Sequence, residues 1–363
     1  MKVALVYDRV NKWGGAERVL LALHELFPDA PLYTSVYNKN KTKWAKVFDI
    51  YTSFLQEFPF AKDAHELYPL LMPTAFESFN FDDYDLVISV TSEAAKGVLT
   101  KPHTLHICYC LTPTRYLWSG YDEYFHSKLS KLLSSPAIAY LRSWDKVAST
   151  RPDRYIAISQ EVKKRIETYY ENPTQIIHPP VGLFEGIPLK SSNREREYFL
   201  VVSRLVPYKR IDLAIEACNN LKLRLKVVGA GSELDRLKSI SGPTIEFLGA
   251  ISDEELIPIY EGAKALIFPG FEDFGIVMVE ALGFGTPVIA FKRGGALDIV
   301  EHKKTGIFFS KQKVSSLMNA LALFEKHQFD PRQLRSQAKL FSKTLFKKKM
   351  SKYIVECLQM SKI

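Results

Sequence analysis

Cysteine is scarce in this chain, and its placement excludes two common kinds of site. The 363 residues contain four cysteines, Cys108, Cys110, Cys218 and Cys357. Their spacing fits neither a zinc site nor a disulfide framework. Cys108 and Cys110 alternate within an apolar run, so we expect them in a buried strand. Reduced thiols of a cytoplasmic protein are therefore the expectation.

Long hydrophobic runs are also absent. No stretch reaches the roughly 18 uninterrupted apolar residues of a membrane-spanning helix. The first residues, MKVALVYDRV, are too short and too acidic for a signal peptide and predict a first strand instead. The composition, 47% hydrophobic and 25% charged, is typical of a globular protein. We expect a cytoplasmic protein, with a peripheral position on the inner face of the cytoplasmic membrane as the alternative.

The order of predicted elements indicates an α/β protein with two domains. A chain of 363 residues exceeds the usual size of a single core. Short β-rich runs alternate with helical patterns, which favours parallel sheets covered by helices. Proline and glycine cluster between Asn172 and Ser192, so we predict domains over 1–180 and 181–345, followed by a basic helix over 346–363. The predicted strands are Val3–Tyr7, Leu32–Val36, Leu86–Val90, Leu105–Cys110, Tyr155–Ile158, Phe199–Val202, Leu225–Val228, Ile245–Leu248, Ala265–Phe268, Val288–Phe291 and Ile307–Phe309.

The positive charge is concentrated at the C-terminal end. The formal net charge is +9, and from Pro331 to Ile363 nine lysines and arginines face one acid, Glu356, a local balance of 9 − 1 = +8. Apolar residues recur there at helical spacing, which predicts a basic amphipathic helix. Its basic face would contact an anionic membrane surface, or its apolar face would simply pack on the protein. Nucleic acid is not expected as a partner, because no binding module accompanies the charge.

The stretch Phe271–Gly285, FEDFGIVMVEALGFG, predicts a loop that runs into a helix. Backbone N–H groups at such a junction suit a phosphate. Glu272 and Glu280 flank that position and suit the hydroxyl groups of a sugar and a ribose. The alternative is an acidic loop followed by a buried helix. The residues that would offer the backbone amides are Phe274, Gly275, Ile276 and Val277.

Two other loops carry residues suited to a diphosphate. Arg204 and Lys209 follow a predicted strand, and together they would clamp a diphosphate, although surface cations are common. Glycine pairs follow two further strands, where they allow close backbone approach to a ligand or simply form a tight turn. The glycines are Gly14, Gly15, Gly229 and Gly231.

A loop after the fourth predicted strand carries aromatic residues, which suit pyranose rings. Its alternative interpretation is a structural loop with a surface arginine. Asp83 and Asp85 match the D-x-D pattern of metal-dependent sugar transferases, but they directly precede a strand, so we expect no metal site. The candidate residues for sugar or acceptor contacts are Leu111, Thr112, Arg115, Tyr116 and Trp118.

In their order and spacing these motifs resemble glycosyltransferase family 4, the retaining GT-B type. The segments GGAERVLLALHELFPDAP, YDLVISVTSEAAKGVLT and HICYCLTPTRYLW are similar to bacterial mannosyltransferases that build O-antigen and other surface polysaccharides from GDP-mannose. The resemblance implies two Rossmann-like domains facing a central cleft, with the C-terminal helix crossing back to the first domain. It also implies a nucleotide-sugar donor in the C-terminal domain, a glycan or polyprenyl-diphosphate-linked acceptor in the N-terminal domain, and no metal or other cofactor.

The resemblance assigns roles to individual residues. Arg204 and Lys209 neutralise the donor diphosphate, Glu272 contacts sugar hydroxyls, and Glu280 bonds the ribose. Gly15 approaches the diphosphate from the N-terminal domain. Relatives usually have histidine where this chain has Leu111. That departure leaves two alternatives open: a donor such as UDP-glucose, UDP-galactose or UDP-GlcNAc, and a non-catalytic nucleotide-sugar-binding scaffold. A GT-B sugar epimerase is a third alternative, and it would require carboxylates in the cleft that the sequence does not place.

Overall fold

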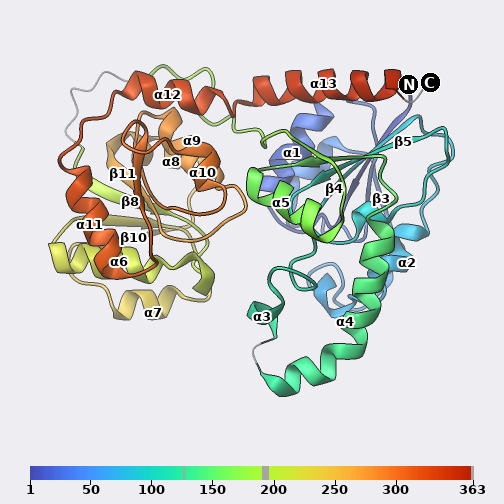
Figure 1. Cartoon of the computed structure of the whole chain (residues 1–363), viewed down its shortest axis with the longest axis horizontal. Coiled ribbons are helices and arrows are strands. Elements are labelled where there is room, and N and C mark those ends of the chain that lie inside the picture. The colour runs from blue at the N-terminus through green and yellow to red at the C-terminus, as the bar shows by residue number, and fades with distance from the viewer. Residues whose placement is uncertain (126, 190–195, 361–363) are drawn as a thin grey trace. The chain divides into compact units, whose positions relative to one another are not determined.

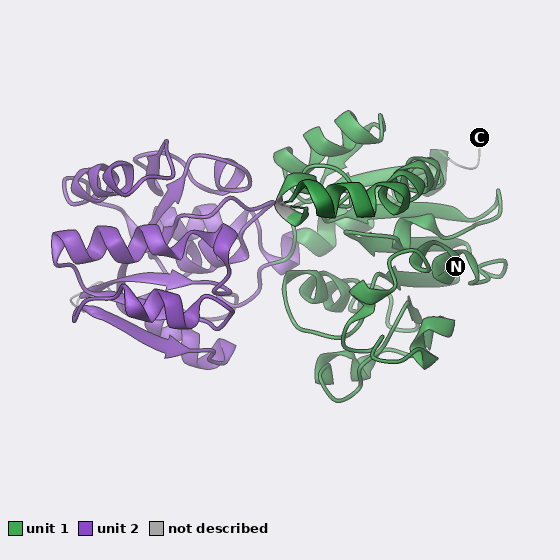
Figure 2. Cartoon of the chain, turned by 90° about the horizontal axis from the view of Figure 1, so that it is seen from below, with its two compact units in different colours: residues 1–180, 346–363 green, residues 181–345 purple. Residues whose placement is uncertain are grey.

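The computed structural model describes residues 1–125, 127–189 and 196–360. They form two compact units (Figure 2). Unit 1 contains residues 1–180 together with 346–363, and unit 2 contains residues 181–345. Each unit is built on a parallel β-sheet, as expected of an α/β protein with two doubly wound sheets (Figure 1).

The sheet of unit 1 has the strand order β3-β2-β1-β4-β5-β6-β7, and every neighbouring pair is parallel. Its central strands are buried along their whole length, as strands covered by helices on both faces should be. The strands are β1 (Val3–Tyr7), β2 (Leu32–Thr34), β3 (Ile50–Thr52), β4 (Leu86–Thr91), β5 (Leu105–Cys110), β6 (Arg154–Ala157) and β7 (Thr174–Ile176). The α-helices are α1 (Gly15–His24), α2 (Met72–Glu77), α3 (Tyr121–Tyr124), α4 (Lys128–Ala148) and α5 (Gln160–Tyr169).

The sheet of unit 2 has the order β10-β9-β8-β11-β12-β13, again with parallel pairs. Its core packs strand residues such as Val201 and Ile267 against helix residues such as Ile215 and Leu321. The strands are β8 (Tyr198–Val202), β9 (Leu225–Val228), β10 (Ile245–Gly249), β11 (Ala263–Phe268), β12 (Val288–Phe291) and β13 (Gly306–Phe309). The α-helices are α6 (Ile211–Leu221), α7 (Leu234–Ser239), α8 (Asp253–Gly262), α9 (Ile276–Gly283), α10 (Ala296–Ile299), α11 (Val314–Phe324) and α12 (Pro331–Lys339).

The structure differs from the predicted elements at the edges of the first sheet. β3 and β7 are strands that the sequence pattern does not indicate, and each has only three residues. Neither contains the run of buried apolar residues that marks the central strands. They become strands because they pair with β2 and β6 in the folded protein. Between β3 and β4 the chain forms short 3₁₀ turns and one α-helix, α2.

The basic C-terminal segment forms two helices, α12 and α13 (Lys343–Met360), and residues 361–363, including Lys362, lie outside the described residues. Four apolar side chains of α13 are buried: Phe346, Met350, Ile354 and Cys357. The tail therefore packs on the protein through its apolar face. Within the described residues, no helix combines the length and the apolar character needed to cross a membrane.

Candidate functional site

The strand order of unit 2 fixes where a ligand site belongs. In a doubly wound parallel sheet the ligand binds at the carboxyl ends of the strands, at the point where the strand order reverses. That reversal lies between β8 and β11. The loop after β8 carries Arg204 and Lys209, and the loop after β11 carries Glu272. Three of the predicted site residues therefore lie on the two loops at the reversal point.

Lys209 and Glu272 form an ion pair between these loops. Lys209 ends the 3₁₀ turn Pro207–Lys209 and is only 8% exposed. Its ammonium group also lies 5.1 Å from the ring centroid of Tyr208. Arg204 Nη2 donates a hydrogen bond of 2.8 Å to the Tyr208 hydroxyl. Tyr208 thus contacts both cations of the loop after β8, and Lys209 reaches the Glu272 loop.

Gly229 and Gly231 hold the Arg204 loop in place. A Cβ at Gly229 would overlap the carbonyl oxygen of Ser203, and one at Gly231 would overlap that of Leu205. Gly229 also has φ +132°, which side chains rarely tolerate. The Leu205 N–H donates to the Ala230 carbonyl at 2.9 Å. The glycines after β9 are therefore required by packing against the loop after β8, a reason that differs from the ligand approach predicted for them.

The loop from Glu272 to Gly275 is shaped by glycines in the same way. Gly275 begins α9 with φ +101°. A Cβ at Gly295 would overlap Phe274, and the Gly295 N–H donates to the Glu272 carbonyl at 2.9 Å. Phe274 itself is buried and lies against Phe341 with ring centroids 5.7 Å apart. The first turn of α9 is thereby fixed at the carboxyl end of β11.

Glu280 occupies a different environment from Glu272. It lies in the middle of α9, is 2% exposed, and accepts a hydrogen bond of 2.8 Å from the hydroxyl of Tyr260 on α8. Burying a carboxylate is costly unless it is hydrogen-bonded, so this contact stabilises the packing of α8 on α9. Of the two acids predicted for the sugar and the ribose, Glu272 is the more exposed, with a side chain 23% accessible.

In unit 1 the strand order reverses between β1 and β4, and the buried Asp8 bridges this point. Its carboxylate accepts a hydrogen bond from the Thr91 hydroxyl at 2.8 Å. It also accepts from the backbone N–H groups of residues 92–95, at 2.7 to 3.1 Å. One acid directly after β1 therefore organises the whole loop after β4.

An ion pair between the same two loops perturbs the pKa of Glu93. Arg9 Nη1 lies 2.7 Å from Glu93 Oε1, and His65 Nε2 lies 3.6 Å from Glu93 Oε2. Burial favours the neutral acid, but the positive charge of Arg9, followed by the contacts with His65, outweighs it and lowers the pKa of Glu93 to about 2. Glu93 is therefore an anion at neutral pH and cannot serve there as a general acid.

Gly14 and Gly15 lie at the start of α1. Gly14 is the N-cap with extended backbone, and the helix starts at Gly15. The following acid, Glu17, is buried and accepts a hydrogen bond of 2.6 Å from the Tyr7 hydroxyl. This contact ties the first turn of α1 to the end of β1 across the intervening loop of residues 8–13.

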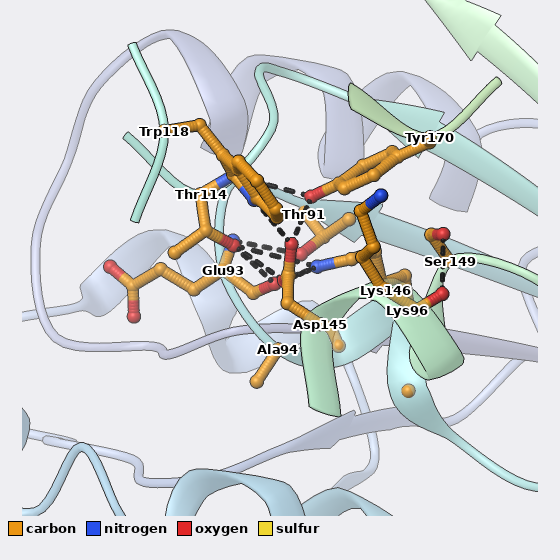
Figure 3. Close-up of polar contacts among 12 residues, drawn as sticks. Thr91, Glu93, Ala94, Lys96, Thr114, Trp118, Asp145, Lys146, Ser149 and Tyr170 are labelled. Atoms are coloured by element: carbon orange, nitrogen blue, oxygen red, sulfur yellow. Dashed lines mark hydrogen bonds and ion pairs between the residues drawn. The ribbon is translucent and has the colours of Figure 1, made fainter. Parts of the chain in front are cut away.

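The loop after β5, residues 111–118, is held by hydrogen bonds to Asp145 of α4. Its carboxylate accepts hydrogen bonds from Thr114 Oγ1 at 2.9 Å and from Trp118 Nε1 at 2.7 Å. Lys96 Nζ lies 2.5 Å away and the Tyr170 hydroxyl 2.8 Å. Figure 3 shows these side chains around Asp145. Burial alone would lower the pKa of Lys96, but the charge of Asp145 outweighs it and raises that pKa.

This arrangement specifies what each residue of the loop does. Thr112 is buried, and its hydroxyl accepts from Arg165 Nη1 at 3.1 Å. Trp118 stacks on Tyr169 with ring centroids 5.2 Å apart. Leu111, Arg115 and Tyr116 are half-buried. The side chains of Thr112 and Trp118 thus have structural partners within unit 1, and Tyr116 lies against Tyr124 with ring centroids 6.2 Å apart.

Two further observations concern unit 1 and the chain as a whole. A pocket beside Asp145 is lined by Glu93, Thr114 and Tyr116 and has room for about one water molecule. In the part of the chain that the structure describes, no group of three or more His, Cys, Asp or Glu side chains is arranged to hold a metal ion.

Comparison with known proteins agrees with the geometry of unit 2. Residues 188–341 match the family model described as Glycosyl transferases group 1. This segment is therefore similar to the glycosyltransferases of group 1. It contains Arg204, Lys209, Glu272 and Glu280.

Individual relatives share parts of the chain. An uncharacterized glycosyltransferase of Methanocaldococcus jannaschii is 26% identical over 209 residues, which are 56% of this chain and 58% of the relative. A GDP-mannose-dependent alpha-(1-6)-phosphatidylinositol monomannoside mannosyltransferase of Mycobacterium tuberculosis is 31% identical over 146 residues, 35% of this chain and 38% of the relative. The matches thus span only about two fifths to three fifths of the length of these relatives.

The fold extends over the whole chain. The structure of Anabaena HepE in complex with UDP-glucose superposes with a TM-score of 0.70, covering 98% of this chain and 100% of that one at 20% identity. The two-sheet α/β architecture predicted from the sequence is thereby confirmed as the GT-B fold.

The structure also contains polar residues that the sequence pattern does not reveal. Asp8, Lys96 and Asp145 are buried at the carboxyl ends of the first sheet, yet each stands in an ordinary sequence context. One signal was available for Asp145, because an acid on an otherwise basic helix requires a partner when it is buried. The donors that surround it come from distant segments and depend on the fold.

Proposed function

We propose that the protein is a retaining glycosyltransferase whose unit 2 binds a nucleotide-sugar donor. The observation that carries the proposal is the ion pair of Lys209 and Glu272 at the reversal point of the sheet, within the segment that matches the group 1 family model. A cation pair beside a carboxylate suits a ligand that combines a diphosphate with sugar hydroxyls.

Each residue would have one task in the donor complex. Arg204 and Lys209 would bind the diphosphate, so that Lys209 exchanges Glu272 for a phosphate oxygen. Glu272, once released, would accept hydrogen bonds from sugar hydroxyls. The N–H groups of 274–277 would complete the phosphate site at the start of α9, and Glu280 would accept a hydrogen bond from the ribose.

The reaction would break the bond between the anomeric carbon and the phosphate oxygen and form the new glycosidic bond on the same face of the sugar. The leaving phosphate would accept the proton of the acceptor hydroxyl, so no carboxylate is required as a base. Arg204 and Lys209 would stabilise the charge that develops on the phosphate, and one such contact typically contributes about 3–4 kcal/mol.

GDP-mannose is the donor that we propose first, and a surface-polysaccharide glycan or a lipid-linked oligosaccharide is the acceptor. The M. tuberculosis relative is named as a GDP-mannose-dependent mannosyltransferase, which supports this choice. The HepE structure contains UDP-glucose, so a uridine donor is the alternative. Leu111, which stands where relatives usually have histidine, favours a second function, a nucleotide-sugar-binding scaffold without turnover.

Purified protein mixed with GDP-mannose, UDP-glucose or UDP-GlcNAc and a lipid-linked acceptor tests these alternatives. The proposal predicts that one donor raises the melting temperature and that its nucleoside diphosphate is released. Lys209→Ala should abolish most of that release, and Lys304→Ala, which removes a surface ion pair with Glu301, should leave it unchanged. Donor binding without release on any acceptor would establish the scaffold instead.

A further inference from the structure

Helix α4 has two apolar faces, and only one of them is covered by the protein. Its inner face buries Ile138 and Leu141, together with Asp145 and Ala148. Its outer face carries Leu129, Leu132 and Leu133, which are 65%, 70% and 73% exposed. Single exposed leucines are ordinary, but three within two turns of one helix form a continuous apolar patch.

The exposed residues form one stripe along the helix. Leu133, Tyr140 and Val147 follow one another at intervals of seven residues, and Tyr140 and Val147 are 50% and 56% exposed. At 3.6 residues per turn these positions lie on one face, opposite the buried Ile138 and Asp145. Figure 1 shows the N-terminal end of α4 projecting away from the strands of its unit. We call the five residues Leu129, Leu132, Leu133, Tyr140 and Val147 the outer stripe.

The charges of α4 indicate the chemistry of its partner. The helix contains four cations and one acid, and that acid is the buried Asp145. Lys128 and Lys146 are exposed and lie on the same edge of the outer stripe, 18 residues or five turns apart. Lys131 pairs with Asp122, and Arg142 donates to the Leu117 carbonyl at 2.7 Å. The exposed charge beside the outer stripe is therefore positive at both ends.

We propose that the outer stripe of α4 inserts into the interface of an anionic phospholipid bilayer. An apolar helix face with lysines along its edge is the pattern of an interfacial helix, whose leucines enter the acyl boundary as its cations meet anionic headgroups. A second copy of the chain is a less suitable partner, because copies with a net charge of +9 repel one another. This assigns membrane contact to α4 in place of the basic tail, whose apolar face is already buried.

Co-sedimentation of the full-length protein with vesicles tests the assignment. The protein should bind vesicles of equal parts phosphatidylglycerol and phosphatidylcholine, and bind vesicles of phosphatidylcholine alone much more weakly. The combined variant Leu129→Ser, Leu132→Ser, Leu133→Ser should lower the partition coefficient roughly tenfold or more, because it removes the apolar groups that enter the bilayer. The matched control, Leu221→Ser, Leu297→Ser, Leu340→Ser, changes three exposed leucines of unit 2 and should bind like the wild type.

Three outcomes would overturn the proposal. The first is a wild type that does not bind anionic vesicles, and the second is a triple α4 variant that binds them as the wild type does. The third is a change of oligomeric state in that variant, seen by light scattering, which would identify the outer stripe as a protein interface. A further variant, Lys348→Glu, Lys349→Glu, Lys352→Glu, reverses charge on the basic tail. It should bind anionic vesicles better than the triple α4 variant does, and weaker binding than that variant would assign the contact to the tail. Nucleoside diphosphate release with a water-soluble acceptor should be unchanged in the α4 variant, so this test is independent of the proposed activity.

Discussion

Lys209 on the loop after β8 is ion-paired with Glu272 on the loop after β11, across the point where the strand order of the second sheet reverses. Two residues predicted to contact different parts of one ligand thus contact each other. In the proposed donor complex, a diphosphate would have to compete with Glu272 for Lys209. That competition would couple donor binding to the position of the Glu272 carboxylate.

Glu272→Gln should separate nucleotide binding from turnover. The amide no longer pairs with Lys209, so we expect GDP or UDP to bind more tightly, by several-fold, in calorimetry. Release of nucleoside diphosphate from the complete donor should fall, because the sugar loses a charged hydrogen-bond acceptor. Weaker binding of the free nucleotide by this variant would contradict the competition.

Gly229→Ala tests whether the glycines after β9 act by positioning the Arg204 loop. The added Cβ would overlap the Ser203 carbonyl, and φ +132° adds strain of about 1–3 kcal/mol. We expect weaker donor binding together with a lower free energy of unfolding. Gly186→Ala is the matched control, because Gly186 also has positive φ but no atom lies within 4 Å of its Cβ position. Equal loss of donor binding in both variants would refute the positioning role.

Asp145→Ala should be among the most destabilising single substitutions in unit 1. It leaves Lys96 buried without its carboxylate, and breaking a buried pair in this way costs about 3–5 kcal/mol. Urea unfolding measures the loss. The double variant Lys96→Met, Asp145→Leu should regain part of it, whereas Lys304→Ala at the exposed pair should change stability by about 0–1 kcal/mol. A double variant no more stable than Asp145→Ala would show that the cost does not come from the unpaired charge.

Tyr260→Phe tests the structural role of Glu280 separately from any role in donor binding. The substitution removes the hydrogen bond donated to the buried carboxylate, which should cost about 1–3 kcal/mol of unfolding free energy. If Glu280 also bonds the ribose, Glu280→Gln should weaken donor binding more than Tyr260→Phe does. Calorimetry on both variants provides the comparison, and equal donor affinities would remove Glu280 from the donor site.

Acid should destabilise the protein through His106. Burial, and then the charge of Arg151, lower the pKa of His106 to about 3, whereas an unfolded histidine titrates near 6.5. Between these values only the unfolded chain takes up the proton, so stability is full above about pH 6.5 and falls by about 1.4 kcal/mol per pH unit as pH decreases toward 3. His106→Gln, which keeps a partner for Ser89, should flatten this dependence in urea unfolding between pH 6.5 and 4.5. An unchanged slope would show that His106 does not titrate in this way.

The sequence predicts the fold well because parallel strands leave a strong signal. Runs such as Leu105–Cys110 are apolar throughout, and buried strands need that pattern. The edge strands β3 and β7 lack that pattern, because each forms by pairing with the strand beside it in the sheet, β2 or β6.

The candidate site was predictable where loops follow strong strands. Arg204, Lys209 and Glu272 lie at carboxyl ends of neighbouring strands, so their spacing was informative. The contacts that fix these loops were not predictable. The packing of Gly229 on Ser203 joins segments that are distant in the sequence. The same is true in unit 1 of the hydrogen bond from Trp118 to Asp145. The same holds for α4, because the sequence shows apolar spacing but not which of two faces is buried.

The central claim is that unit 2 binds a nucleotide sugar through Lys209 and promotes its transfer. Nucleoside diphosphate release by wild type, Lys209→Ala and Lys304→Ala, with the preferred donor and a lipid-linked acceptor, tests it most directly. The account predicts a loss of roughly 10²–10³-fold for Lys209→Ala and none for Lys304→Ala. Release by Lys209→Ala at the wild-type rate would contradict it.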